Sequence, residues 1–206
     1  MYIPAQFRET ERKHQLDLIR NHSFGVLVSN HAGQPFASHL PFMLDTDPDG
    51  EARLFGHMAR ANPQWQSFDA GATVLAIFQG PHAYVSPSWY STPGVPTWNY
   101  ATVHVYGTAR VIHDTNIVRR HLELLVDEHE AQSVQPWTIA ATGGQFDPLL
   151  SAVVAFEICI SDIQGKFKLS QNRPAQDRVS VAQHLRARAG TLDSTLADLM
   201  ECRQER

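Results

Sequence analysis

The longest alternation of apolar and polar residues runs from Thr102 to His113. Small or apolar residues occupy every second position there, and polar or larger residues stand between them. A period of two gives a strand two distinct faces. The pattern therefore predicts a long strand over 102–113.

Helical spacing of apolar residues is clearest over 114–130. Val118, Leu122, Leu125 and Val126 form one stripe, and Asp114 or Thr115 can cap the first turn. Further helices are predicted at 8–21, at 62–68, at 172–189 after Asn172-Arg-Pro, and at 191–203, where a fraying tail is the alternative.

Short apolar runs bounded by turn residues predict the remaining strands, at 24–29, 36–44, 52–58, 73–78 and 152–160. Asn30–Gly33 has the composition of a hairpin turn. The segment 80–96 holds four prolines and is predicted to be a long loop. Its aromatic residues argue against disorder.

Six or more strands at hairpin spacing, with helices at the edges, predict a mainly β fold: an antiparallel barrel with appended helices. No regular βαβ alternation, no GxGxxG and no GxxxxGK[ST] occur, so Rossmann and P-loop folds are disfavoured. We expect one main domain over 1–190 and a C-terminal helical tail over 191–206.

Composition narrows the class of protein. The 206 residues are 43% hydrophobic and 18% charged, with a net charge of −4, which disfavours broad electrostatic binding to nucleic acid. Cys159 and Cys202 show no CxxC spacing, so a reducing cytoplasm is expected. No signal-peptide core occurs near the first residues, and no run approaches the roughly 20 apolar residues of a membrane span.

The segment Gly56–Trp65, GHMARANPQW, combines a strand end, an arginine and an Asn-Pro helix start. The first N–H groups of a helix lack partners within the helix and attract anions. Arg60 can add a planar fork of donors that matches phosphate oxygens. The segment predicts an anion site, and an ordinary strand-to-helix connection with a surface arginine is the alternative.

Two further clusters could contact a ligand. In an extended segment Trp98 and Tyr100 point to one side and Asn99 to the other, which suits a flat heteroaromatic ligand or a subunit interface. Lys166 and Lys168 share a face by alternation, and Arg173 follows. They form either a phosphate contact or a solvated basic edge.

Histidine is abundant, with 11 residues, and His39, His57, His82 and His104 lie in strand-like segments. They lack HxH and HxxxH spacing, so hydrogen-bonded histidines are favoured over a zinc or haem site. No GxSxG occurs, and adjacent Ser38 and His39 must point to opposite strand faces, so a serine hydrolase is rejected.

Several of these segments together resemble the PaiB family. The resemblance is carried by the opening MYIP with Phe7-Arg8 and by five blocks, Ala37–Pro41, Gly56–Trp65, Leu75–Tyr90, Val95–Tyr100 and Gly165–Pro174. It extends from residue 1 to about residue 185. Members of this family are described as FMN-binding negative transcriptional regulators linked to protease synthesis and sporulation.

The resemblance implies an FMN-binding split β-barrel similar to pyridoxine-phosphate oxidases, working as a homodimer with the flavin at the subunit interface. It implies that the flavin phosphate and ribityl chain lie at His57, Met58, Ala59, Arg60 and Asn62. It further implies that Ser38, His39 and Leu40 lie along the isoalloxazine. From the facing subunit it implies contacts by Trp98, Asn99, Lys168 and Gln171.

Three functions follow as hypotheses. The first is a flavin-bound negative transcriptional regulator that acts on DNA directly or through a protein partner. The second is an NAD(P)H-dependent flavin oxidoreductase, for which no catalytic motif is visible. The third is a haem-binding split barrel with His39, His57 or His104 as an axial ligand. The regulator is favoured, and DNA contact by so acidic a chain is expected to be local, weak or mediated by a partner.

Overall fold

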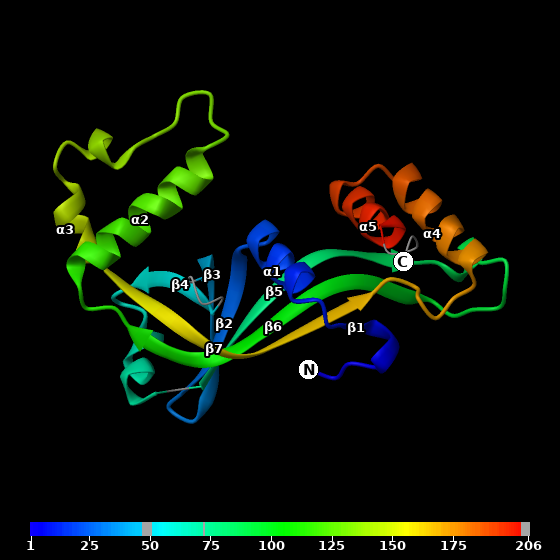
Figure 1. Ribbon diagram of the computed structural model, residues 1–206, viewed down its shortest axis with the longest axis horizontal. Helices are drawn as coiled ribbons and strands as arrows, with labels where there is room; N and C mark the ends of the chain where they lie inside the picture. The colour runs from blue at the N-terminus through cyan, green and yellow to red at the C-terminus, as the bar shows by residue number, and fades with distance from the viewer. Residues whose placement is uncertain (47–50, 72, 203–206) are drawn as a thin grey trace. The chain divides into compact units, whose positions relative to one another are not determined.

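The computed structural model describes residues 1–46, 51–71 and 73–202. The strands are β1 (Arg8–Glu9), β2 (Phe24–His31), β3 (Gln34–Thr46), β4 (Ala52–Ala59), β5 (Thr73–Val85), β6 (Thr97–Val111) and β7 (Val153–Lys168) (Figure 1). The α-helices are α1 (Arg12–Asn21), α2 (Thr115–Glu130), α3 (Phe146–Leu150), α4 (Ala175–Ala187) and α5 (Thr191–Glu201). The 3-10 helices are η1 (Ala5–Phe7), η2 (Pro63–Ala70), η3 (Pro87–Trp89) and η4 (Ile139–Thr142).

The chain forms two compact units, each built from separate segments. Unit 1 consists of Met1–His22, Phe78–His104 and Ile163–Arg206. Unit 2 consists of Ser23–Ile77 and Val105–Asp162. The predicted boundary at residue 190 stays a prediction, and α5 lies in the same unit as α4.

Unit 2 is a β-barrel. Its strands follow the order β7-β4-β3-β2-β5-β6, and a further β6–β7 pairing closes the ring. The first hairpin pairs His31 with Gln34, and Ala32 and Gly33 between them both have positive φ, as a two-residue turn of type I′ requires. This confirms the turn predicted at 30–33.

The core of unit 2 follows from the alternation along its strands. Aromatic rings meet at its centre: the ring of Phe156 lies 6.2 Å from that of Phe42 and 5.2 Å from that of Phe68. Gly56 lies directly against this cluster, and a Cβ there would come within 2.7 Å of the Phe156 ring. A side chain at position 56 would therefore displace the central ring of the core.

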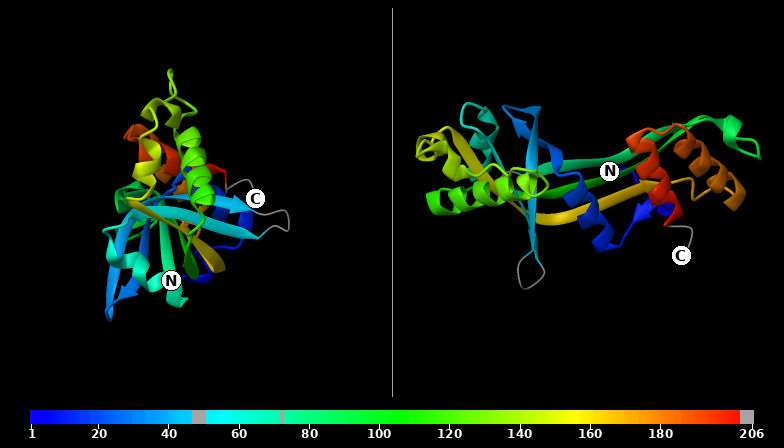
Figure 2. Two further views of the ribbon diagram at one scale, coloured as in Figure 1. Left: turned by 90° about the vertical axis from the view of Figure 1, so that its left-hand side faces the viewer. Right: turned by 90° about the horizontal axis from the view of Figure 1, so that it is seen from above.

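Unit 1 contains β1, paired with β7 from Arg8↔Lys166, and the two C-terminal helices. Helices α4 and α5 lie side by side, orange and red in Figures 1 and 2, and Leu185 of α4 and Leu196 and Met200 of α5 are buried. Residues 191–201 therefore form an ordered helix, and the frayed alternative is wrong for this part of the chain.

Within unit 1, one carboxylate ties the long connection after β5 to α4. Asp177 of α4 is fully buried and accepts hydrogen bonds from the Ser91 N–H and hydroxyl, both at 2.7 Å, and from the Thr92 hydroxyl at 2.5 Å. The guanidinium of Arg173 stacks 4.2 Å from the Tyr90 ring centroid and donates to the Pro93 carbonyl. Proline-rich sequence is therefore held by side chains rather than by a strand ladder.

The mainly β fold with helices is confirmed, and several segment boundaries are corrected: β7 continues to Lys168 rather than ending at 160, and the helix predicted from residue 8 begins at Arg12, after β1. The predicted loop at 80–96 begins too early, because β5 continues through Gly80-Pro81 to Val85. Proline is tolerated there since β5 pairs with β2 only over Leu75–Ile77, so position 81 needs no donor to β2. Strand β6 likewise begins at Thr97 rather than Thr102. Among the described residues, no helix has the length and apolarity to cross a membrane.

Candidate functional site

The predicted anion site lies where β4 ends and η2 begins, in unit 2. Arg60 is exposed, yet its guanidinium donates from Nε to the Ser151 carbonyl at 2.7 Å and from Nη2 to the Val153 carbonyl at 2.9 Å. Its backbone N–H donates to the Ala152 carbonyl at 2.8 Å. These bonds fix the cation against the start of β7 and use two of its five side-chain N–H groups.

Asn62 joins this junction to β3. Its Oδ1 accepts from the Gln64 N–H at 3.0 Å, which caps η2, and its Nδ2 donates to Ser38 Oγ at 2.8 Å. The predicted helix start is confirmed, although the helix is of the 3-10 type. Because both ends of the amide are used, Asn62 positions the junction, and the turn it stabilises brings Arg60 and β3 together.

A cavity of about 390 Å³ opens beside Arg60. Its walls come from the end of β6, the start of β7, the start of α2 and the end of α3 with the residue after it. Polar side chains at the cavity are those of Arg60, Trp65, His113, Thr115 and Ser151. A volume of this size lies within the range of cofactor and ligand sites.

Alternation divides the predicted flavin residues between the two faces of the barrel wall. His39 and Ala59 are exposed, whereas Ser38, Leu40 and Met58 are buried in the core. That these residues lie along the flavin stays a prediction; the burial of Ser38, Leu40 and Met58 leaves their backbone groups as the atoms nearest to a ligand on the outer face. Exposed His39 and buried Ser38 also confirm that these neighbours point to opposite faces.

An exposed aromatic residue stands beside His39. The ring of Phe24 on β2 is 68% exposed and lies 6.4 Å from the His39 ring, centroid to centroid, at an interplanar angle of 30°. Phe24 and His39 together form a solvent-exposed aromatic surface on the outside of unit 2. Sequence reasoning missed Phe24, although its place in β2 opposite Pro41 follows from the hairpin register.

His57 lies under α2 rather than in the open. Its ring is 6.2 Å from that of His121, and the His57 Nδ1 and His121 Nε2 atoms are buried without a hydrogen-bond partner. Burial lowers the pKa of His57, and burial followed by the charge of His57 lowers the pKa of His121 to about 4. Both imidazoles are therefore neutral at pH 7.

The remaining predicted residues belong to unit 1. Trp98 is 54% exposed and its ring packs edge-on against that of Tyr84 at 6.1 Å. Asn99 is fully buried and donates to Ser170 Oγ at 2.8 Å, so its side chain lies in the interior, and its contact with a flavin stays a prediction. The predicted opposition of Trp98 and Asn99 is confirmed.

Lys168 and Gln171 occupy neighbouring positions in unit 1. Lys168 Nζ donates to the Trp98 carbonyl at 2.8 Å and to the Thr97 hydroxyl, and burial, followed by the charge of Lys166, lowers its pKa. Gln171 is used locally: its Oε1 accepts from the Leu169 N–H and its Nε2 donates to the Phe167 carbonyl. Trp98 and Lys168 therefore form one aromatic and cationic surface, to which Gln171 contributes by shaping the chain.

Among the described residues, the histidines considered as alternative metal ligands do not gather into a three-ligand metal site, and the haem alternative, which needs only an axial histidine, stays a prediction. Within residues 1–46, 51–71 and 73–202, no three His, Cys, Asp or Glu side chains are placed to hold one metal ion. His39 is exposed while His57 is covered by His121 of α2. No sequence pattern pointed to His121, because its contact with β4 depends on how α2 packs against that strand.

Comparison with known families and sequences gives a consistent result. A family model described as "Putative FMN-binding domain" matches residues 1–162. A Bacillus subtilis protein named "Protease synthase and sporulation protein PAI 2" is 37% identical over 203 residues, which cover 98% of this chain and 97% of that protein. An uncharacterized protein from Emericella nidulans is 29% identical over 88% of each chain.

Solved structures share the fold at low sequence identity. The FAD and heme binding protein from Mycobacterium smegmatis superposes with a TM-score of 0.60 and 18% identity, covering 84% of this chain and 78% of that one. The flavocytochrome Anf3 from Azotobacter vinelandii gives a TM-score of 0.61 and 13% identity, covering 84% and 75%. At these identities the likeness concerns the fold alone.

Proposed function

The chain belongs to the FMN-binding domain family, and from that premise we propose that it is a PaiB-type negative transcriptional regulator that works as a flavin-bound homodimer. The family makes FMN the cofactor. Three points are proposed beyond this: which residues bind FMN, how two subunits share it, and what the flavin-bound complex does.

The observation that carries the proposal is Arg60 at the mouth of a cavity of about 390 Å³. The residues present suit FMN: the phosphate needs a cation with several N–H donors, and Arg60 is held in place by two carbonyl bonds that leave other donors on the same guanidinium. Thr115 and His113 can add hydrogen bonds from the same cavity.

The isoalloxazine requires a flat apolar wall and a few polar contacts. His39 and Phe24 supply such a wall in unit 2, with Ala59 as a small residue on the outer surface. The backbone groups of Ser38, Leu40 and Met58 remain available for edge contacts, and His57 supports β4 from beneath α2. Bound in this way, FMN would supply hydride or single-electron chemistry.

A homodimer explains two exposed aromatic surfaces on one chain. Phe24 is 68% exposed in unit 2, and Trp98 is 54% exposed in unit 1 beside Lys168. Large apolar side chains left in water are typical of interfaces. In the proposal Trp98 and Lys168 of the facing subunit cover the flavin, while Asn99 and Gln171 hold that surface in shape.

The regulatory role rests on likeness to the Bacillus subtilis protein named for protease synthase and sporulation. A net charge of −4 does not favour strong phosphate-driven binding to DNA. We therefore propose that the flavin-bound dimer regulates transcription either through a local contact with DNA or by binding a protein partner.

The first experiment records the visible absorption of the purified protein before and after adding FMN, once free flavin is removed, together with its mass by light scattering. Flavin bands at about one equivalent per subunit and a dimeric mass support the site. A monomer, or uptake that is unchanged in both Arg60→Ala and Trp98→Ala, contradicts it.

A second experiment tests regulation. Transcripts are compared between a deletion strain that carries the wild-type gene and one that carries a folded variant unable to retain FMN. Derepression of a defined gene set by the variant supports a flavin-bound repressor. Unchanged transcripts, with bleaching of bound FMN by NADH or NADPH under anaerobic conditions, would favour the alternative, a flavin oxidoreductase.

A further inference from the structure

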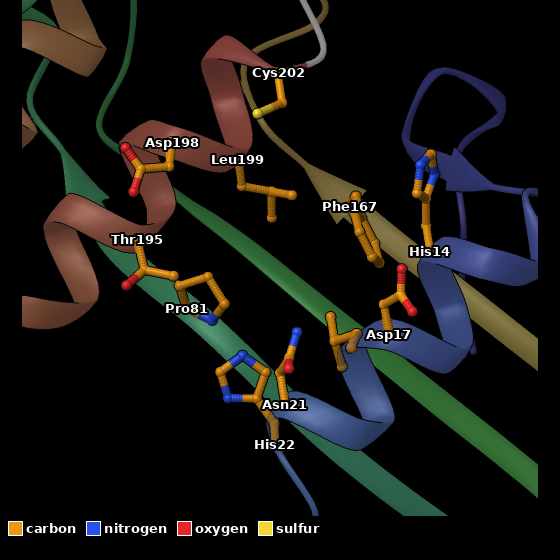
Figure 3. Close-up of a pocket in the computed structure, with 11 residues that line it drawn as sticks. His14, Asp17, Asn21, His22, Pro81, Phe167, Thr195, Asp198, Leu199 and Cys202 are labelled. Carbon is orange, nitrogen blue, oxygen red and sulfur yellow. The ribbon is translucent and has the colours of Figure 1, made fainter. Parts of the chain in front are cut away.

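A second cavity, of about 350 Å³, lies in unit 1 between α1 and α5 (Figure 3). It shares no residue with the cavity beside Arg60. Its walls come from four parts of the chain and are formed by His14, Asp17, Leu18, Asn21, His22, Pro81, Phe167, Thr195, Asp198, Leu199 and Cys202. Nothing in the FMN proposal uses these residues.

The floor of this cavity is apolar. Leu18 of α1 and Phe167 of β7 are buried core residues, and Pro81 of β5 and Leu199 of α5 complete the surface. Figure 3 shows Leu199 and Phe167 pointing into the space between the two helices. Apolar walls of this kind favour a compact hydrocarbon or aromatic group over a sugar or a phosphate.

The ionised groups at the cavity carry negative charge. Asp17 and Asp198 stand on opposite helices, and within the described part of the chain, which ends at residue 202, no lysine or arginine lines the cavity. Burial lowers the pKa of His22, so this imidazole is neutral at pH 7 and can accept a hydrogen bond. Asn21 offers an amide from the same turn of α1 and points into the cavity (Figure 3).

Both carboxylates already have cationic neighbours on the outside. Lys13 Nζ lies 2.6 Å from Asp17 Oδ2, but the lysine side chain is 80% exposed. Arg20 Nη1 lies 3.6 Å from Asp17 Oδ1, beyond hydrogen-bond distance, and Arg186 Nη2 lies 2.6 Å from Asp198 Oδ1. Arg186 also donates to Glu201 at 2.6 Å, so Asp198 belongs to a charge network, whereas the exposed Lys13–Asp17 pair is weak and leaves Asp17 able to share a cation inside the cavity.

We propose that this cavity binds a small amphiphilic amine, with its hydrocarbon or aromatic body against Leu18, Phe167 and Leu199 and its ammonium group at the Asp17 carboxylate. The class follows from the combination of apolar walls with acidic groups and a neutral imidazole. An anionic ligand would be repelled by the Asp17 carboxylate, and a neutral apolar ligand would gain no contact with it.

The test uses tryptamine as the probe and tryptophol, which replaces the amine by a hydroxyl, as its neutral counterpart. Binding to the full-length protein is measured by calorimetry at pH 7.5, with and without saturating FMN. A ligand of this size should bind with a Kd of about 1 mM or tighter. Tryptophol should bind about 10-fold more weakly, since it lacks the charge-assisted contact.

Two variants and a matched control locate the site. Leu199→Trp fills the cavity and should abolish binding, and Asp17→Asn should weaken it about 10-fold. Asp127→Asn removes an exposed carboxylate on α2, outside the cavity, and should leave the affinity unchanged. Retained FMN uptake by each variant shows that the fold is intact.

Saturable binding of tryptamine that prefers the amine and is lost in Leu199→Trp supports the proposal. Absence of saturation up to about 10 mM, equal binding of tryptamine and tryptophol, or binding unaffected by Leu199→Trp overturns it. Because the cavity is distinct from the one beside Arg60, a protein that fails to bind FMN but binds tryptamine contradicts only the proposed flavin site, and the reverse result contradicts only this inference.

Discussion

The ring of His121 on α2 lies 6.2 Å from the ring of His57 on β4, and each carries a buried nitrogen without a hydrogen-bond partner. A second ring, that of Phe55, lies 5.7 Å from His121 on the same strand face. Helix α2 therefore covers β4, the strand that precedes Arg60. The contact consists of neutral imidazole rings and one aromatic ring. Protonating either imidazole places a charge where the packing has no partner for it.

This contact predicts a stability that depends on pH. The folded pKa of His121 is about 4, below the ordinary value of 6.5, so the unfolded chain binds more protons between these values. Stability is fully present above about pH 6.5 and falls as the pH drops towards 4, by up to about 3 kcal/mol. Urea unfolding at a series of pH values measures the slope.

His121→Leu is the matched test of that slope. The variant should keep a stability within about 1 kcal/mol of wild type at pH 7.5, because it removes an unsatisfied nitrogen, and should lose much of the dependence between pH 6.5 and 4. His129→Gln, an exposed substitution on the same helix, serves as the control. An unaltered slope in His121→Leu would mean that other groups govern the acid transition.

Arg60→Ala is expected to weaken FMN binding by about 10- to 100-fold, since a charge-assisted contact with the phosphate is removed. It should also lower the free energy of unfolding by about 1–2 kcal/mol, through loss of the bonds to the Ser151 and Val153 carbonyls. Titration of FMN fluorescence and urea unfolding measure the two effects separately.

Arg60→Lys separates the effect of the positive charge from the effect of the planar, multiple-donor guanidinium group. A lysine keeps the cation but cannot bridge two carbonyls in the same geometry, so affinity should recover in part while stability does not. Arg120→Ala, at an exposed position on α2, is the control. An affinity for FMN that is unchanged in Arg60→Ala would place the phosphate elsewhere.

Asp177→Asn should release the connection between η3 and β6. The Thr92 and Ser91 hydroxyls hold the pKa of Asp177 below its ordinary value, so its contribution is present above the unfolded pKa of 3.8 and is lost as the pH falls through the lower folded value. At pH 7 the variant should be cleaved faster by protease within 86–96. Equal cleavage rates would show that Arg173 and Tyr90 hold the segment without the carboxylate.

Gly107→Ala should destabilise unit 2 more than Gly56→Ala. A Cβ at position 107 would lie 2.3 Å from the Cys159 carbonyl oxygen of the adjacent strand, whereas one at 56 would meet the Phe156 ring at 2.7 Å. A backbone carbonyl moves less easily than a ring, so we expect about 3 kcal/mol or more at 107 and about 1–3 kcal/mol at 56. The opposite order in urea unfolding would refute this argument.

Local sequence predicted most of the elements because their causes are local. The Asn30–Gly33 turn, the Asp114 cap of α2 and the alternation along β6 each depend on residues a few positions apart, and each is confirmed. The start of β6 and the end of β5 were wrong, because strand length is decided by neighbouring strands that accept or end the pairing.

For the candidate site, the sequence by itself determined which residues share a face: Ser38 opposes His39, and Trp98 opposes Asn99. Only the tertiary structure decided which of those faces is buried, that Arg60 donates to Ser151 and Val153 about ninety residues later, and that His121 covers His57. The reason is physical: alternation is a property of one strand, whereas burial and hydrogen-bond partners depend on the segments that pack against it.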